Sequence, residues 1–243
     1  CKLGSVFELN RNEHYWNNAA TSIDIVRHHV AQEPASELSR YRAGELDTTS
    51  TIPAEAFASL RNERPEELHT APLLSVYFYG INLNHAELGD NPKLRQALSM
   101  AIDRELLARQ VVGRGEAPAW RFVPPGVDNY SGPTFPYAGL SQEERRALAQ
   151  ELYLEAGYSA SNPLEVELRY NTSESHRRIA VAIQQMWNDV LGFEVRLINE
   201  EFRVLIANMR AMQITQLFRL SWNGDYNDAN SFLGLFESDN PSV

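Results

Sequence analysis

The chain has 243 residues, 43% of them hydrophobic and 22% charged, which is typical of a globular protein with one large domain or two small ones. Its formal net charge of −10 disfavours nucleic acid as a partner, because phosphates must be neutralised by lysine and arginine. No run approaches the ~18 apolar residues of a membrane-spanning helix, and the first residues contain no signal-peptide apolar region.

Cys1 is the only cysteine, which excludes an internal disulfide and a zinc site made of cysteines. A cysteine at position 1 can be a lipid-attachment site, or it can mark the point at which a longer chain was cut.

Before a domain boundary expected near 72–75, the pattern predicts three strands and two helices. The first helix follows the second strand and leads to the third, and such a strand–helix–strand unit is typical of parallel pairing. The expected strands span residues 6–9, 23–30 and 46–49, and the expected helices span residues 34–44 and 54–61.

The rest of the chain alternates strands with helices. The connections are too long for hairpins, so we expect an α/β domain with a mixed sheet. The expected strands span residues 73–83, 164–170, 193–197 and 214–220, and the expected helices begin near residues 91, 141, 174 and 201. Gly113 and Gly115 are expected to end the first of these helices.

Short motifs support several of these elements. Residues 90–92, Asp-Asn-Pro, offer a capping side chain followed by a proline, and Ser141 with Glu144 forms a capping box. Residues 164–170 alternate apolar and charged side chains, which predicts a strand with one solvent-facing side. Residues 118–139 contain five prolines and predict a long loop that is either functional or wraps a surface. The solvent-facing members of the alternating strand would be Glu165, Glu167 and Arg169.

Residues 215–230 carry side chains suited to holding a ligand. A strand-like run breaks at a glycine, and Arg219, Trp222 and Asp225 lie within seven residues around the break. A cation, a ring and an anion at a strand end can hold a zwitterionic ligand with side chains, and an extended peptide fits that description. The alternative is a strand that ends in an Asx turn, with Asp225 and Asn227 capping backbone groups.

Other chemistries have less support. The sequence has no glycine-rich phosphate loop before a helix and no Gly-x-Ser-x-Gly elbow. His28 and His29 lie on opposite faces of a strand, so they cannot bind one metal ion. Asp225 and Asp228 can form an acid–base pair, but no activated nucleophile accompanies them, so a hydrolase is a minor alternative. Taken alone, His176 at a helix start is a surface histidine.

Six blocks of the sequence resemble, in matching order, the periplasmic dipeptide- and oligopeptide-binding proteins. The first block contains Arg11-Asn-x-x-Tyr-Trp16, and the third ends in Ala97-Leu-Ser-Met-Ala-Ile-Asp-Arg104, both of which are similar to family motifs. The resemblance covers essentially the whole chain. The six blocks are residues 1–16, 42–47, 91–104, 122–125, 170–173 and 222–226.

The resemblance implies an α/β, periplasmic-binding-protein-like fold (type II, cluster C) with two lobes. The chain would be a fragment with mixed sheets and flanking helices from solute-binding protein family 5, whose members are about twice this length. Residues 1–74 would be part of the first lobe, and residues 75–243 would be most of the second lobe without its C-terminal end. For this reason we expect Cys1 to mark a cut and not a lipidated terminus.

The resemblance also implies a function. The protein would be the extracytoplasmic binding component of an ABC importer and would capture short peptides in extended form between two lobes, by strand pairing. It would not be an enzyme, and it would have no cofactor and no metal site. Its partners would be a short peptide and the membrane permease, with no nucleic acid. We expect a monomer in the periplasm, or a cell-envelope lipoprotein.

By the same resemblance, specific residues would contact the peptide. Asp225 would hold the α-ammonium group, because a buried ammonium needs an anionic partner. Arg219 and His176 would lie near the peptide carboxylate, with Arg210 as a weaker match of the same kind. Trp222 would line a side-chain pocket.

Three positions depart from the well-known oligopeptide binder. Gly80 replaces an acid, Val112 replaces a lysine, and Phe202 replaces a tryptophan of a side-chain pocket. These changes leave intact the parts that would pair with the peptide backbone. They leave open which peptide side chains and which peptide length the protein prefers. The alternatives are the same fold binding another solute, such as a cell-wall peptide, a metal chelate or a sugar, and a ligand-sensing domain of a transcriptional regulator.

Overall fold

The computed structural model describes residues 6–31, 33–211 and 216–237. Two compact units divide the chain between Arg64 and Pro65. This division precedes the boundary expected near 72–75 and lies in a charged stretch that contains a proline. None of the helices in the described ranges is long and apolar enough to cross a membrane.

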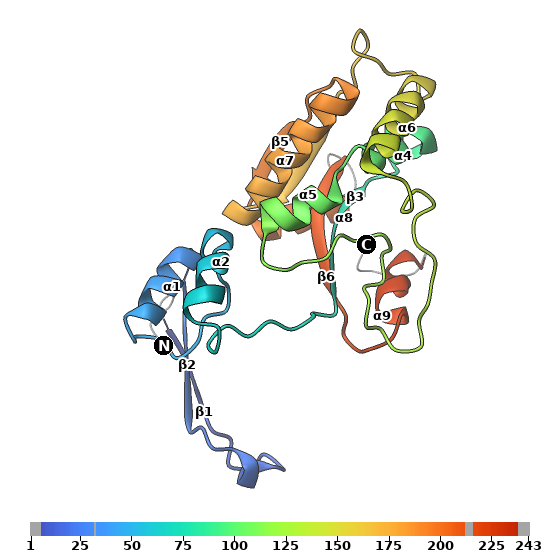
Figure 1. The fold of residues 1–243 in the computed structure, drawn as a ribbon. Helices are drawn as coiled ribbons and strands as arrows, with labels where there is room; N and C mark the ends of the chain where they lie inside the picture. The colour runs from blue at the N-terminus through green and yellow to red at the C-terminus, as the bar shows by residue number, and fades with distance from the viewer. Residues whose placement is uncertain (1–5, 32, 212–215, 238–243) are drawn as a thin grey trace. The chain divides into compact units, whose positions relative to one another are not determined.

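The first unit contains a strand hairpin and two helices (Figure 1). Its elements are β1 (Val6–Asn10), η1 (Asn18–Ala20), β2 (Ile25–His29), α1 (Pro34–Arg42) and α2 (Ala54–Glu63). The two strands pair antiparallel, with Val6 opposite His29. Arg11 closes the hairpin loop, since its guanidinium donates to Asn18 and to the carboxylate of Asp24.

Two predictions for this unit are wrong. Residues 46–49 do not form a strand, and the strands that do form pair antiparallel, so there is no parallel strand–helix–strand unit in this part of the described chain. The bonds of Arg11 fold the connection between the first two strands back on itself, which explains their antiparallel pairing. After α1 the chain is held instead by Ser50, which donates to the carboxylate of Glu37.

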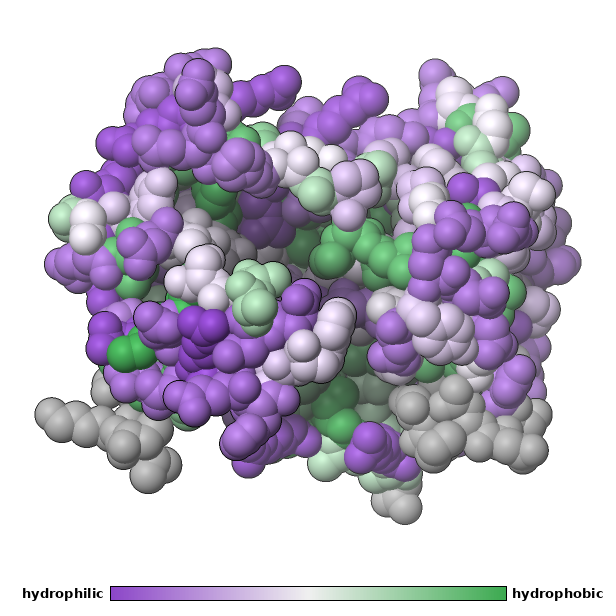
Figure 2. Space-filling model, turned by 90° about the horizontal axis from the view of Figure 1, so that it is seen from below, coloured by the Kyte–Doolittle hydropathy of each residue, from purple (hydrophilic) through white to green (hydrophobic). Residues whose placement is uncertain are grey.

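The hairpin leaves much apolar surface exposed. Figure 2, seen from below, shows apolar residues in green among the hydrophilic ones. Two-stranded hairpins are marginal in water unless another element covers one face. The hairpin therefore contributes exposed apolar surface and little core. Its exposed apolar residues include Phe7, Leu9, Ile23, Ile25 and Val26.

The second unit is a four-stranded mixed sheet flanked by helices, which confirms the predicted α/β class. The strands are β3 (Ser75–Ile81), β4 (Glu167–Asn171), β5 (Arg196–Glu200) and β6 (Leu217–Asn223). Their order is β3-β6-β4-β5, with β3 antiparallel to β6 and β4 parallel to both of its neighbours.

Short motifs bound the helices of this unit as predicted. Ser141 and Glu144 form the capping box, and the Asn91 side chain accepts a hydrogen bond from the Leu94 amide. Gly192 ends the longest helix at a φ of 75°, which favours glycine. The helices are α3 (Ala86–Gly89), α4 (Pro92–Met100), α5 (Arg104–Leu106), the π-helix η2 (Leu107–Val112), α6 (Gln142–Glu155), α7 (Glu174–Leu191), α8 (Phe202–Ala211), α9 (Asn230–Leu233) and η3 (Gly234–Phe236).

The helix expected from residue 91 to the glycine at 113 is interrupted. Asp103 starts a new helix, because its carboxylate accepts the Leu106 amide at 2.9 Å, and the chain then continues into η2. The apolar spacing runs through this interruption, so periodicity alone predicts one helix where the structure has three segments.

The expected solvent-facing side of strand 164–170 is right for Glu165, which is exposed, and wrong for Arg169. Arg169 is only 9% exposed, and its guanidinium makes ion pairs with Glu167 at 2.6 Å and Glu200 at 2.5 Å. Asn208 of α8 donates to Glu200 at 2.7 Å. Because β5 and α8 lie against this strand, Arg169 pairs with Glu167 and with Glu200 of β5 instead of facing water.

The main core lies between the sheet and helices α4, α6 and α7. Trp187, Phe193 and Tyr153 are each at most 3% exposed. Their rings stack, with 5.9 Å between the centres of Trp187 and Phe193 and 5.8 Å between those of Tyr153 and Phe193. The Trp187 indole donates to the Leu98 carbonyl at 2.9 Å. These contacts tie α7 to α4 and α6, and so fix the helix that carries His176.

The proline-rich segment 118–139 packs on the surface of this unit. The guanidinium groups of Arg104 and Arg145 lie 4.9 and 4.5 Å from the ring centre of Trp120. Val123 is 1% exposed and packs with Val76 and Phe232 in a second, smaller core. Of the two roles expected for this segment, wrapping a surface is the one that the structure shows.

Candidate ligand-binding site

The carboxyl end of β6 has an edge that pairs with no other described strand. β4 pairs with β6 only at Leu217 and Phe218, whereas β3 pairs with β6 along its whole length. From Arg219 to Asn223, β6 therefore has β3 alone as a neighbour among the described strands. Free backbone groups at such an edge can accept a further strand.

Arg219 is a buried cation without an anionic partner among the described residues. It is 8% exposed, and its guanidinium donates to the side chains of Asn171 at 3.0 Å and Ser221 at 3.1 Å. The guanidinium also lies 4.4 Å from the ring centre of Tyr77. Within the described ranges its Nε has no hydrogen-bond partner, and no carboxylate forms an ion pair with it. Since an unpaired buried charge is costly, this arrangement suits an anion supplied by a ligand.

His176, the third residue of α7, lies next to Arg219 through Tyr77. Its Nδ1 is 3.4 Å from the Tyr77 hydroxyl, and the two ring centres are 5.7 Å apart. Burial, together with the charges of Arg219 and Arg114, lowers the pKa of His176 to about 4. Burial raises the pKa of Tyr77. At neutral pH both rings are therefore uncharged beside the Arg219 cation. His176 is half-buried, so the prediction of a surface histidine from its position alone is wrong.

Trp222 and Asp225 are joined at the end of β6 by Ser231. The Trp222 indole donates to the Ser231 carbonyl at 2.6 Å, and the Asp225 amide donates to the Ser231 hydroxyl at 2.8 Å. Asp228 caps the turn, since its carboxylate accepts the Asn230 amide at 2.7 Å. The exposed carboxylate of Asp225 has no hydrogen bond or ion pair to any residue that the structure describes. It is therefore free to bind a cation.

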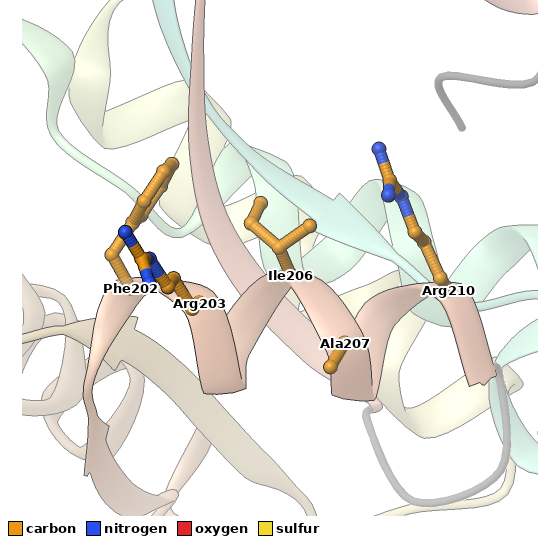
Figure 3. Close-up of a pocket in the computed structure, with 5 residues that line it drawn as sticks. All are labelled: Phe202, Arg203, Ile206, Ala207 and Arg210. Atoms are coloured by element: carbon orange, nitrogen blue, oxygen red, sulfur yellow. The ribbon is translucent and has the colours of Figure 1, made fainter.

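A groove of about 320 Å³ runs along α8. Phe202, Ile206 and Arg210 recur at four-residue spacing and point to the same side of the helix, as Figure 3 shows. Neither Arg203 nor Arg210 forms an ion pair with a described residue. The groove thus has an apolar floor flanked by two cations. It is lined by Phe202, Arg203, Ile206, Ala207 and Arg210.

The glycine at position 80 has a packing reason. Gly80 lies opposite Phe218 in the β3–β6 pair, and a Cβ atom placed on it would lie 2.2 Å from the Phe218 ring. An acidic side chain therefore cannot occupy this position unless the Phe218 ring moves. The same clash excludes any side chain at this position, whatever its charge.

The expected site residues fall into three pairs. Among the described residues, no hydrogen bond or ion pair joins one of these pairs to another. Sequence reasoning missed Tyr77, which lies between Arg219 and His176, and Ser231, which bonds both Trp222 and Asp225. No group of three or more candidate metal ligands occurs among the described residues. The pairs are Arg219 with His176, Trp222 with Asp225, and Phe202 with Arg210.

Comparison with known families decides what kind of protein carries this site. The chain matches the family of bacterial extracellular solute-binding proteins, family 5 (middle), over residues 2–242. The chain belongs to this family. The match covers both compact units, so both come from one family of solute-binding proteins.

Three family members illustrate the relationship. The periplasmic murein peptide-binding protein MppA of Escherichia coli is 37% identical over 227 residues, covering 93% of this chain and 42% of that protein. Its structure superposes with a TM-score of 0.90, at 35% identity, over 98% of this chain and 47% of that one. Haemophilus influenzae OppA in complex with the peptide RPPGFSPFR has a TM-score of 0.86 at 33% identity, over 98% of this chain and 47% of that chain.

A third relative is named for a different ligand. The probable deoxycholate-binding periplasmic protein YgiS of Escherichia coli is 35% identical over 229 residues, covering 94% of this chain and 42% of that protein. The chain thus spans about half the length of the relatives that it matches.

Proposed function

We propose that the protein binds short peptides in extended form, as the extracytoplasmic binding component of an ABC importer. The observation that carries this proposal is an edge of β6 that pairs with no other described strand. Among the described residues, the cation Arg219 at one end of this edge and the anion Asp225 beyond the other form no ion pair. A peptide has free charges at both ends and a backbone that can pair with a strand. Relatives named for peptides support the same ligand class.

The positions of the two charges set the direction of the peptide. With its ammonium group at Asp225 and its carboxylate at Arg219, the peptide runs antiparallel to β6. A strand rises about 3.3 Å per residue, so the six steps between these residues span at most about 20 Å. A bound peptide with both termini held is therefore expected to have no more than about six residues.

We propose that residues 1–74 are part of the first lobe of the binding protein and that residues 75–243 are most of the second. The relatives are about twice as long as this chain, and their remaining parts would supply more of the ligand site. The protein is expected to be a periplasmic monomer, or a cell-envelope lipoprotein, that delivers its ligand to a membrane permease. It is expected to catalyse no reaction.

One further ligand class has its own support. The groove on α8 combines apolar side chains with Arg203 and Arg210, an arrangement suited to an amphipathic anion. A relative named as a probable deoxycholate-binding protein is 35% identical to this chain. Peptides remain the preferred ligands, because an amphipathic anion gives no role to the free carboxylate of Asp225.

The role of Asp225 can be tested with trialanine and its N-acetylated form. We expect the longest natural form of the protein to bind the free-amine peptide at least about 30-fold more tightly, because acetylation removes the charge that pairs with Asp225. Asp225→Ala should remove most of this preference. Isothermal titration calorimetry measures both affinities.

Asp228→Ala is the matched control, because Asp228 lies in the same turn and its carboxylate is occupied by the Asn230 amide. This variant should keep the preference for the free amine. Equal affinity of the unsubstituted protein for both peptides would show that Asp225 does not bind the ligand amine.

A further inference from the structure

We propose that His176 takes up a proton when a peptide carboxylate binds at Arg219, so that the protein binds peptides more tightly as the pH falls. This inference rests on the proposed function and adds a regulatory property to the same site. It depends on the arrangement of Arg219, Tyr77 and His176, which come from β6, β3 and α7.

The three side chains form a continuous group. Tyr77 lies between the other two, with the Arg219 guanidinium 4.4 Å from its ring centre and the His176 Nδ1 3.4 Å from its hydroxyl. Arg219 is 8% exposed, and its Nε is an unpaired donor in the described part of the chain. Because the charge of Arg219 acts on His176, a carboxylate that pairs with this guanidinium also changes the electrostatic environment of the imidazole.

The surroundings of His176 disfavour its charged form in the free protein. Arg219 and Arg114 are the nearby cations, and with burial they hold the pKa of His176 at about 4. Arg114 pairs with Glu116 at 2.9 Å, so that carboxylate is already engaged. The positive end of the α7 dipole acts in the same direction, because His176 lies in the first turn.

The remaining titratable groups around His176 do not reverse this effect. Tyr77 and Tyr79 of β3 stay neutral, because burial raises the pKa of each. Glu174 in the same helix is exposed and pairs with Arg177 at 3.5 Å. Among the described residues, the imidazole thus has two cations nearby and no carboxylate free to balance them.

A bound carboxylate changes this balance. It neutralises Arg219 and offers an acceptor to a protonated imidazole, and both effects favour the charged form of His176. If binding restores the ordinary pKa of 6.5, proton uptake occurs between pH 4 and pH 6.5. The affinity is then about tenfold higher at pH 5.5 than at pH 8, since the bound state carries a proton that the free state lacks.

Calorimetry with the longest natural form of the protein can test this coupling. Trialanine and its C-terminal amide are titrated at pH 5.5 in two buffers with different heats of ionisation, so that the difference in heat gives the protons taken up. We expect close to one proton per trialanine bound and much less for the amide, which lacks the carboxylate. Binding of trialanine should be about tenfold tighter than at pH 8.

Two variants assign the proton to His176. His176→Gln should bind more weakly at pH 5.5 and take up no proton, whereas His14→Gln, at an exposed position in the first unit, should behave like the unsubstituted protein. Binding of trialanine without proton uptake, or uptake that persists in His176→Gln, would overturn the inference and leave the proposed function standing. Absence of binding by every peptide would instead contradict the proposed function.

Discussion

Replacing Arg219 with methionine is expected to lower peptide affinity by about 100-fold or more while leaving the fold at least as stable as before. The loss of affinity follows because a buried carboxylate without its cationic partner is strongly disfavoured. The stability should rise by on the order of 1 kcal/mol, because the substitution removes a desolvated charge that no described carboxylate balances. Urea denaturation and calorimetry measure the two effects separately.

Arg169→Met is the matched control for this experiment. Arg169 is 9% exposed, nearly as buried as Arg219, but it pairs with Glu167 and Glu200. Its removal leaves the buried carboxylate of Glu200 without its cation, while Glu167 keeps its ion pair with Arg196. We therefore expect a loss of about 3–5 kcal/mol in the free energy of unfolding. A comparable loss of stability in Arg219→Met would mean that Arg219 is a structural residue and not a site held ready for an anion.

Trp187→Ala is expected to destabilise the second unit by about 3–5 kcal/mol. The side chain is 3% exposed, stacks on Phe193 and donates to the Leu98 carbonyl, so its loss leaves a cavity and an unpaired backbone group. The free energy of unfolding, measured by urea denaturation, tests this expectation.

Trp16→Ala provides the comparison for Trp187→Ala. Trp16 is 86% exposed, so its replacement should change the stability of this chain by less than about 0.5 kcal/mol. Similar losses in both variants would contradict the assignment of the core to the stacked rings around Phe193.

Local signals predict a large part of this fold. Ser141 with Glu144 marks a helix start, and Gly192 marks a helix end, because caps depend on a few neighbouring residues. The bonds of Arg11 to Asn18 and Asp24 are also local, and they close the hairpin. A strand needs a partner as well as a suitable composition, and residues 46–49 pair with no described strand.

The burial of charged side chains could not be predicted from the alternating pattern. Arg169 alternates with apolar residues as Glu165 and Glu167 do, and this pattern predicts that it faces solvent. In the structure, Glu200 of β5 pairs with it. The site shows the same division. One short stretch of sequence is enough to single out Arg219, Trp222 and Asp225. The burial of Arg219 against Tyr77 could not be predicted, because it depends on the pairing of β3 with β6, two strands far apart in the sequence.

Native mass spectrometry of the protein purified from its own cells tests the central claim most directly, because ligand that copurifies can be weighed. The account predicts a set of bound masses that fragment as peptides of no more than about six residues, with free amino termini. A single bound mass that is not a peptide, such as a sterol acid, a sugar or a metal chelate, would contradict it.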